Sequence, residues 1–424
     1  MEDIRYPVYL NDRQYLRELA LYQAELAHLP GMQERAEEWI LHNDLKGEKP
    51  IVTIENRTFA SDILPSLCCE GKAARVIEHK LLSTIYGYLF TRDDRVVPDF
   101  YALIPTITLR IFGLKLVEHR AKDQKQRTVG FKIDHPITDL EKQVHELGQS
   151  VYDFDRALFE EEKMLAEEAF GDILPVKQQC PPLSYCLTKH IVELMGMEDM
   201  MYAFYDYPDE LHLLVQRIEE EYNRYFDFLE SGDLLVPNND NVLVKMGTFG
   251  FTNDLPGREQ MNGRKPKLKE LWGHLNSQET VSISPSMFNE YFLDSYVRVA
   301  EKFGLFTYGC CEPVHGFWDS SLKKLPKGLR KLSISAWCDE EFIGERLRGS
   351  HIIYHRKPAA TFIGVGDQLD EEAFAEHIKR TILAAKGCKL EISMRDIYTL
   401  GADKMKAVKA MEITRNLIDR YWQT

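Results

Sequence analysis

The sequence lacks a long apolar run and an excess of positive charge. No window approaches the roughly 18 apolar residues of a membrane-spanning helix. The first five residues do not place a basic segment before an apolar one, so we expect no signal peptide, no membrane anchor and a cytoplasmic location. The 53 Lys and Arg residues are outnumbered by 67 Asp and Glu residues, which gives a formal net charge of −14. This charge disfavours nucleic acid as a partner, because phosphates require a basic face.

Disulfides are also not indicated. Eight cysteines in a 424-residue chain that is not exported are expected to be reduced. Four of them lack the mutual spacing of metal ligands and are expected to pack in the core: Cys68, Cys69, Cys180 and Cys186. The chain shows no internal repeat and no low-complexity tract.

Short apolar segments alternate with helical patterns along most of the chain. Apolar positions at helical spacing predict one or two helices within residues 10–45, before any strand. Further helices are predicted at 208–229, 286–303, 371–386 and 402–421. Strands are predicted at 50–55, 95–100, 172–177, 234–237, 280–284, 305–309, 332–336, 352–355 and 389–394.

This alternation predicts βα units around a parallel sheet, and so an α/β fold. We expect one (β/α)8 TIM barrel over residues 48–424, preceded by a helical segment, residues 1–47, packed on it. Nine candidates compete for eight strand positions, so at least one should be a hairpin or an extra strand. Residues 238–268 are rich in Asn, Asp, Gly and Pro and are expected to form a long loop.

The apolar segment 303–307 leads into Cys310, Cys311 and Glu312. Barrel enzymes carry their sites at the carboxyl ends of strands, and thiols and carboxylates are metal ligands. Adjacent residues at a strand end face opposite sides, so one thiol should face the barrel mouth, and we favour Cys311. A one-residue shift in register would reverse this assignment, and both thiols could instead simply pack.

Other polar residues lie near the predicted strands. Glu279, Gln278 and His274 precede the strand at 280–284, and Glu279 could bind a ligand or metal or form a salt bridge at the rim. For His274, a satisfied core histidine is the alternative to a ligand. Trp337 and Asp339 follow the strand at 332–336, and Asp339 could bind substrate or cap the next helix.

Two further regions carry candidate groups. Arg356 and Lys357 are predicted to form an inward cationic pair that could hold a carboxylate or carbonyl group, and the alternative is an ion pair with Asp339 or Asp396. Asp99 and Tyr101 lie at the end of the strand at 95–100, and Asn239 opens the long loop as either a site group or a turn former.

Several segments resemble the uroporphyrinogen decarboxylase superfamily, which joins decarboxylases to zinc-dependent, corrinoid-linked methyltransferases. The similarity runs from about residue 50 to the end, and the segments are SISPSMFNEYF, LFTYGCCEP, LSISAWCDEE, HIIYHRKPA and CKLEISMRDIYTLG. They most resemble a bacterial branch with a Cys-Cys-Glu-Pro signature. The resemblance implies a distorted (β/α)8 barrel.

The chain departs from both branches of that superfamily. Decarboxylases carry an arginine-rich run after the first strand that clamps the porphyrinogen carboxylates, whereas this chain has only Arg57 there. Asp396 stands where the methyltransferases have their last zinc cysteine, and a carboxylate is also a zinc ligand. Cys311, Glu279, Asp396 and Cys310 are therefore the predicted zinc ligands.

We expect a zinc-dependent methyltransferase that passes a methyl group from a small substrate to a corrinoid protein. The alternatives are a decarboxylase of a uroporphyrinogen-like or smaller acid, and a barrel that only binds a small molecule or a corrinoid partner. A second copy of the chain is a further partner to consider. The predicted catalytic residues are Asp99, Tyr101, Glu312 and Asp339, and the predicted substrate-binding residues are Arg57, Asn239, His274, Gln278, Trp337 and Arg356.

Overall fold

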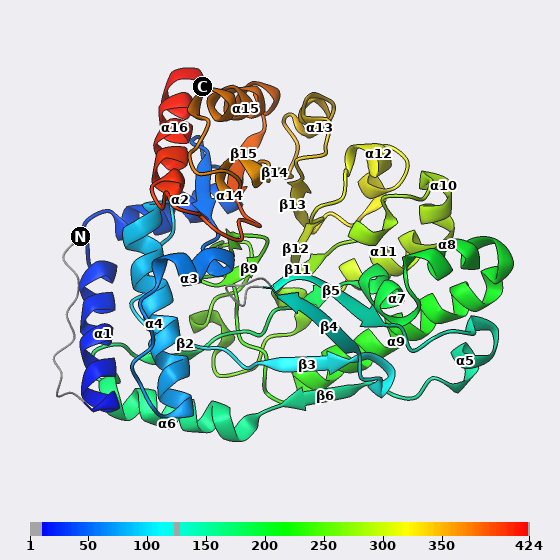
Figure 1. The fold of residues 1–424 in the computed structure, drawn as a ribbon, viewed down its shortest axis with the longest axis horizontal. Coiled ribbons are helices and arrows are strands. Elements are labelled where there is room, and N and C mark those ends of the chain that lie inside the picture. Colours follow the sequence, from blue (N-terminus) through cyan, green and yellow to red (C-terminus); the bar gives the residue numbers. More distant parts are fainter. Residues whose placement is uncertain (1–10, 123–127, 423–424) are drawn as a thin grey trace.

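A parallel sheet of seven strands forms the centre of the computed structural model, which describes residues 11–122 and 128–422 (Figure 1). The strands are hydrogen-bonded in the order β1-β15-β14-β13-β12-β11-β8, so the first strand lies beside the last. Their bounds are β1 (Ile51–Ile54), β8 (Ser184–Tyr185), β11 (Trp272–Leu275), β12 (Leu305–Tyr308), β13 (Leu329–Ile334), β14 (Ile353–Arg356) and β15 (Lys389–Met394). The α/β prediction is confirmed. Within the described residues no strand joins β8 to β1, so hydrogen bonds do not close the sheet into a barrel.

Helices follow most of these strands and pack on the sheet. They are α7 (Leu187–Met195), α8 (Met197–Asp206), α9 (Pro208–Ser231), α10 (Pro285–Phe288), α11 (Asp294–Ala300), α12 (His315–Trp318), α13 (Glu340–Leu347), α14 (Thr361–Gly364), α15 (Glu371–Ala384) and α16 (Lys406–Tyr421). The expected helices at 208–229 and 371–386 are confirmed as α9 and α15. The one expected at 286–303 is a series in which a π-helical turn, η6 (Asn289–Leu293), joins α10 to α11.

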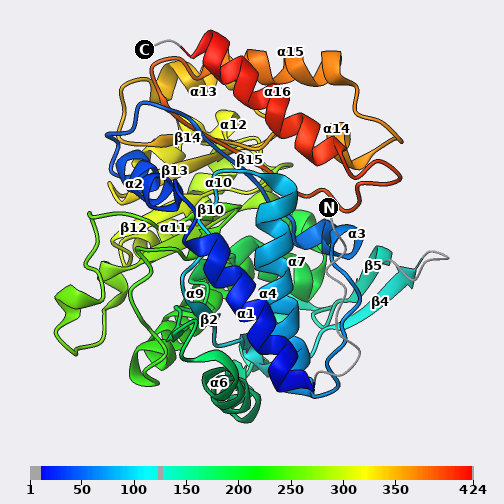
Figure 2. The same ribbon diagram turned by 90° about the vertical axis from the view of Figure 1, so that its left-hand side faces the viewer.

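The N-terminal part of the chain forms a helical layer beside the sheet. Its helices are α1 (Asp12–Ala27), α2 (Met32–Asn43), α3 (Ala60–Ile63), α4 (Lys72–Thr91) and α6 (Arg156–Phe170), whereas α5 (Leu140–Glu146) packs against α9 on the other side of the molecule (Figure 1). Figure 2 shows α1 running alongside α4, and these two helices share an apolar cluster with α6. One or two helices were expected within residues 10–45, and two are present, α1 and α2. Among the described residues no helix is both long and apolar enough to cross a membrane.

Four short strand pairs lie outside the main sheet. One is parallel, β2 (Tyr101–Leu103) with β7 (Val176–Gln178), and the others are antiparallel. The antiparallel pairs are β3 (Ile107–Arg110) with β6 (Val151–Phe154), β4 (Val117–Lys122) with β5 (Thr128–Asp134), and β9 (Leu243–Lys245) with β10 (Thr248–Phe249).

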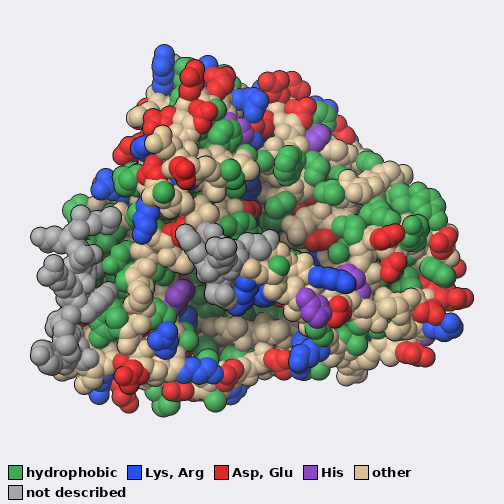
Figure 3. Space-filling model, viewed as in Figure 1, with side chains coloured by type: hydrophobic (Ala, Val, Ile, Leu, Met, Phe, Trp, Pro, Cys, Tyr) green, Lys and Arg blue, Asp and Glu red, His purple; other side chains and the backbone are tan. Residues whose placement is uncertain are grey.

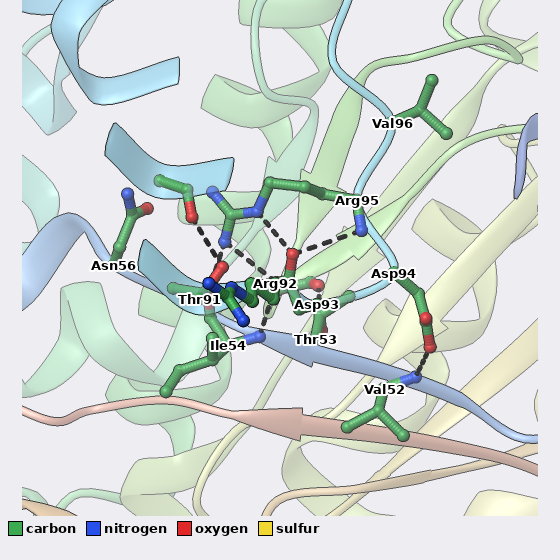
Figure 4. Close-up of polar contacts among 12 residues, drawn as sticks. Val52, Thr53, Ile54, Asn56, Thr91, Arg92, Asp93, Asp94, Arg95 and Val96 are labelled. Atoms are coloured by element: carbon green, nitrogen blue, oxygen red, sulfur yellow. Dashed lines mark hydrogen bonds and ion pairs between the residues drawn. The ribbon is translucent and has the colours of Figure 1, made fainter. Parts of the chain in front are cut away.

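Carboxylates occupy the free edge of β1 (Figure 4). The Val52 amide donates to Asp94 Oδ2 at 2.7 Å, and the Ile54 amide donates to Asp93 Oδ2 at 2.9 Å. Asp93 is fully buried and also accepts two hydrogen bonds from the guanidinium of Arg95. These side chains satisfy the amides that a neighbouring strand would otherwise pair. This is why the strand expected at 95–100 is absent and the chain becomes extended only at β2.

Side chains of the central strands alternate between an apolar and a polar face. Leu332, Tyr354 and Ile392 face the helices and belong to the main apolar core. The polar residues alternate with them and define the inner face of the sheet: Thr53, His274, Thr307, Lys331, Ser333, His355, Glu391 and Ser393. A buried polar face requires internal hydrogen bonds, and these residues bond mainly to one another.

The β9–β10 hairpin lies on this inner face. Its turn is Met246-Gly247, where both residues have positive φ, as a two-residue type I′ turn requires. The Gly247 carbonyl accepts a hydrogen bond from Thr53 Oγ1 at 2.9 Å, and Lys331 Nζ donates to Thr248 Oγ1 at 2.5 Å. The segment expected as one long loop, 238–268, therefore contains a hairpin that fills part of the inner face.

Three further predicted strands were wrong, in addition to the one at 95–100. Residues 234–237 are irregular, and 172–177 overlaps only the start of β7. The apolar alternation at 280–284 follows a short 3-10 helix, η5 (Gln278–Thr280), and the strand of that βα unit is β11, eight residues earlier. Its sequence, Trp-Gly-His-Leu, was overlooked because a glycine and a histidine interrupt the apolar pattern.

Candidate functional site

Two adjacent thiols lie at the carboxyl end of β12. Gly309 has φ +95°, a left-handed conformation that turns the chain directly after Tyr308. Cys310 Sγ and Cys311 Sγ are 3.6 Å apart, and Cys311 is exposed whereas Cys310 is half-buried. The hydrogen bond from the Cys310 thiol lowers the pKa of Cys311, and the guanidinium of Arg395 acts in the same direction. Cys311 is therefore the thiol of this pair that ionises first and reaches solvent.

Glu312 positions the loop that carries these thiols. Its buried carboxylate accepts hydrogen bonds from the amides of Ser277 at 2.9 Å and Cys310 at 2.7 Å. These bonds join the loops that follow β11 and β12. Burial raises the pKa of Glu312. The predicted catalytic residue Glu312 is thus placed as a support of the thiol loop.

A chain of ion pairs lies at the same edge of the sheet. Arg395 Nε is 3.4 Å from Glu55 Oε2, and Arg57 Nε is 3.4 Å from Glu55 Oε1. Arg395 also donates to Asp396 Oδ1 at 3.2 Å, and Asp396 has a positive φ of 59°. Arg57, which was expected to bind substrate, is largely exposed at the outer end of this chain.

Lys357 lies just beyond the end of β14, two residues after the inner-facing His355. Its amide donates to the Ile334 carbonyl at 2.8 Å, which continues the pairing with β13. The side chain is only 5% exposed, and Nζ has no hydrogen-bond partner among the described residues. Burial, followed by the charge of Arg395, lowers the pKa of this lysine well below its ordinary value.

His274 lies on the same face, toward β11. Its Nδ1 is 2.7 Å from Thr307 Oγ1 and its Nε2 is 3.2 Å from Asn276 Nδ2. Burial lowers its pKa well below the ordinary value, assisted by the charge of Lys245. His274 is therefore neutral and has a hydrogen-bond partner at each ring nitrogen, which fits the alternative of a satisfied core histidine.

Arg356 corrects one prediction. Arg356 and Lys357 were expected to face inward together. Only Lys357 does so, because adjacent strand residues point to opposite faces. The guanidinium of Arg356 lies in the helix layer, where it donates to Glu340 Oε1 at 2.6 Å and to main-chain carbonyls. A role for Arg356 in binding substrate at the inner face is therefore wrong.

Four other candidates either have partners on neighbouring elements or are exposed. Asp339 caps α13 through the Phe342 amide at 2.9 Å, and Trp337 is exposed. Asp99 is exposed, and the buried Tyr101 donates to Glu162 Oε1 at 2.6 Å.

The remaining candidates are held within loops. Asn239 donates to the carbonyls of Thr252 and Leu255 and so shapes its loop. Gln278 is half-buried at the start of η5, and the buried Glu279 accepts from Thr188 Oγ1 at 2.7 Å.

Arg395 links the thiols, Lys357 and two acids: it forms ion pairs with Glu55 and Asp396, and its charge acts on both thiols and on Lys357. Sequence reasoning gave Arg395 no role of its own, although its alternation with Ser393 along β15 places it on the inner face. Figure 3, in the view of Figure 1, shows a hollow below the centre of this face of the molecule, with Lys and Arg side chains at its edge.

The thiols fit half of a zinc site. Two thiolates on a tetrahedral zinc with 2.3 Å bonds lie about 3.8 Å apart, close to the separation in the Cys310–Cys311 pair. A catalytic zinc uses three protein ligands. Within residues 11–122 and 128–422, no three His, Cys, Asp or Glu side chains are arranged to hold one metal ion. The predicted ligand Glu279 is bonded to Thr188, so the residues present do not fit the predicted zinc centre.

Comparisons with known proteins give little further constraint. No protein-family model matches the chain, and no curated protein matches it. Among solved structures, the chain is similar to a methyltransferase from Methanosarcina mazei, with 10% sequence identity and a TM-score of 0.46 over 92% of this chain and 99% of that one. A likeness this distant defines neither the reaction nor the residues that perform it.

Proposed function

We propose that this chain is a methyltransferase that acts on a small methylated substrate at the carboxyl-terminal edge of the sheet. The observation that carries the proposal is the exposed Cys311 thiol, held 3.6 Å from Cys310 with its pKa lowered. A thiolate is the nucleophilic form of cysteine. It is suited to attack a methyl carbon bonded to an oxygen or nitrogen leaving group.

In this reaction the Cys311 sulfur forms a bond to the methyl carbon as the carbon–oxygen or carbon–nitrogen bond breaks. The leaving atom keeps the bonding electron pair and takes a proton from solvent, which completes the demethylated product. Cys310 donates its S–H to the thiolate and so favours the ionised form of Cys311. Glu312 keeps both thiols at the end of β12 through its two hydrogen bonds to main-chain amides.

The resemblance to corrinoid-linked methyltransferases suggests the acceptor. We propose that a reduced corrinoid carried by a partner protein would accept the methyl group from Cys311, supplying the electron pair of the new bond, while the sulfur keeps the pair of the broken sulfur–carbon bond and becomes a thiolate again. Zinc is given no step, because the third ligand that a catalytic zinc requires is not in place.

The test follows the methyl group. After incubation with methoxy or methylamine donors, mass spectrometry should find one added methyl group on Cys311, and a reduced corrinoid protein should then accept it. Cys311→Ala should abolish both signals, while Cys310→Ala should retain the site of methylation at a lower rate. The proposal is wrong if methyl transfer occurs with Cys311 unmodified. Zinc bound at one equivalent and lost in Cys311→Ala would instead make the thiol a metal ligand.

The two alternatives predicted from the sequence have less support. The decarboxylase alternative relied on an acid near Asp99, and that side chain is exposed rather than on the inner face. A barrel that only binds its ligand would leave the nucleophilic thiol pair without a role. Carbon dioxide release from a small acid by the wild type would favour the decarboxylase, and ligand binding without turnover would favour the binding protein.

A further inference from the structure

A buried lysine without a hydrogen-bond acceptor among the described residues lies within electrostatic range of Cys310. Lys357 Nζ is shielded from solvent and has no hydrogen-bond partner among the described residues. Interior charges are normally paired, because moving an unpaired ion out of water costs several kcal/mol. Burial of Lys357 destabilises the fold, which suggests a function for this residue at the carboxyl end of β14.

No acid forms an ion pair or hydrogen bond with Lys357 Nζ among the described residues. Glu391 faces it from β15, where Oε2 accepts from Lys331 Nζ at 2.7 Å and Oε1, which has no hydrogen bond, lies 3.3 Å from His355 Nε2. Arg395, which follows β15, adds positive charge, and its own acids are Glu55 and Asp396. The groups that influence Lys357 electrostatically are Arg395, Glu391, Cys310 and Lys331.

A second polar group in this cluster also lacks a hydrogen bond. Arg395 Nε is buried without one among the described residues, since its 3.4 Å ion pair with Glu55 is not aligned as a hydrogen bond. Arg395 and Lys357 lie at the ends of adjacent, paired strands. The other nitrogens of Arg395 donate to Met246 Sδ and Asp396 Oδ1, so the unused donors of these two neighbouring side chains are Arg395 Nε and Lys357 Nζ.

We propose that Lys357 and Arg395 bind a carboxylate group of the substrate at the carboxyl ends of β14 and β15, next to the Cys310–Cys311 pair. A carboxylate would supply the acceptors that both donors lack and the negative charge that Lys357 lacks. The site would thereby select a short acid that carries a methylated oxygen or nitrogen. This inference rests on the proposed function, because it identifies the substrate class for the same thiols.

The first experiment measures binding without turnover. Methoxyacetate is the carboxylate probe, 2-methoxyethanol is its neutral counterpart, and sulfate represents a free inorganic anion. Isothermal titration should detect methoxyacetate binding that is at least tenfold tighter than binding of either other probe. Since Lys357 has a lowered pKa and becomes an ammonium beside the carboxylate, binding near pH 8 should take up protons, which buffers of different ionisation enthalpy reveal.

Variants then assign the site. Lys357→Met and Arg395→Gln should each weaken methoxyacetate binding by at least tenfold, whereas Lys404→Met, at an exposed lysine, should not change it. Circular dichroism and thermal unfolding show whether each variant is folded. Unchanged binding in a folded Lys357→Met protein, or equal binding of methoxyacetate and 2-methoxyethanol, would overturn the proposal. Sulfate binding as tight as methoxyacetate binding would show a general anion site and also overturn it.

These results are separable from those on methyl transfer. Carboxylate binding that is lost in Lys357→Met but never leads to methylation of Cys311 would support the binding site and refute the proposed reaction. Methylation of Cys311 by neutral donors, with no carboxylate binding, would support the proposed reaction and refute the carboxylate site.

Discussion

Replacing Lys357 with methionine should stabilise the protein. Methionine has nearly the length of lysine and fills irregular interior space, so the packing should be retained while the unpaired amine is removed. A lysine that titrates near 10.4 when unfolded must lose its proton to remain buried and neutral, which costs up to about 4.6 kcal/mol at pH 7. If the amine stays charged, the cost of moving the ion out of water replaces the cost of deprotonation. We expect Lys357→Met to raise the free energy of unfolding by about 2–4 kcal/mol at pH 7.

The pH dependence gives the sharper test. Because the pKa of Lys357 is lowered on folding, the unfolded chain binds more protons at this residue, and the lysine destabilises the fold at pH values below its unfolded pKa. As pH rises from the folded pKa toward about 10, this penalty shrinks by up to about 1.4 kcal/mol per pH unit. The stability advantage of Lys357→Met over wild type should therefore decrease steadily between pH 7 and pH 9.

Urea unfolding followed by circular dichroism at pH 7, 8 and 9 measures this difference. Lys404→Met is the matched control, since an exposed lysine should change stability by less than about 0.5 kcal/mol. The reasoning is refuted if Lys357→Met is less stable than wild type at pH 7 in ligand-free buffer, or if its advantage is the same at every pH.

Three further predictions concern the sheet edge and the thiol loop. Asp93→Ala should lower the free energy of unfolding by about 3–5 kcal/mol in urea titrations, because it removes the acceptor of a β1 amide and leaves a guanidinium unpaired; a loss below about 1 kcal/mol would contradict this. Gly309→Ala should cost about 1–3 kcal/mol, since φ is +95° and a Cβ would lie 3.2 Å from a neighbouring side chain, whereas Gly316→Ala, with open space around it, should be close to neutral. Cys310→Ala should move the pH midpoint of Cys311 alkylation by iodoacetamide upward, because the lowering hydrogen bond is lost, and an unchanged midpoint would show that the two thiols do not interact.

The sequence predicted those strands whose apolar residues are uninterrupted. Lys389–Met394 was placed to the residue, and the strand at 50–55 lies within one residue of β1 at each end. The sequence did not predict that Asp93 and Asp94 accept the amides at the free edge of β1 in place of a neighbouring strand. Two aspartates with this role produce no periodic hydrophobic pattern. Residues 95–100 look extended, and whether such a segment pairs depends on partners distant in the sequence.

Prediction of the site succeeded for position and failed for detail. The strand-end rule placed Cys310 and Cys311 correctly at the carboxyl end of β12, because that rule depends only on strand direction. The strand-end rule does not say which face of the sheet Arg356 and Lys357 occupy. Alternation along β14 would have placed Lys357 on the inner face and Arg356 on the outer face. The predicted ligand Glu279 was misplaced because the strand before it was assigned eight residues too late.

The inner face also determines when this protein can fold. Thr53 Oγ1 lies 2.8 Å from Ser393 Oγ, a contact between residues 340 positions apart, and the β9–β10 turn reaches β1 across 194 positions. During synthesis β1 emerges early but finds its hydrogen-bonding strand only when the last strand has been made. The contact of Asp94 with the Val52 amide spans only 42 positions and can form long before. We therefore expect a slow, late assembly step typical of chains with distant contacts, during which one edge of β1 is already occupied and the other remains open to wrong partners.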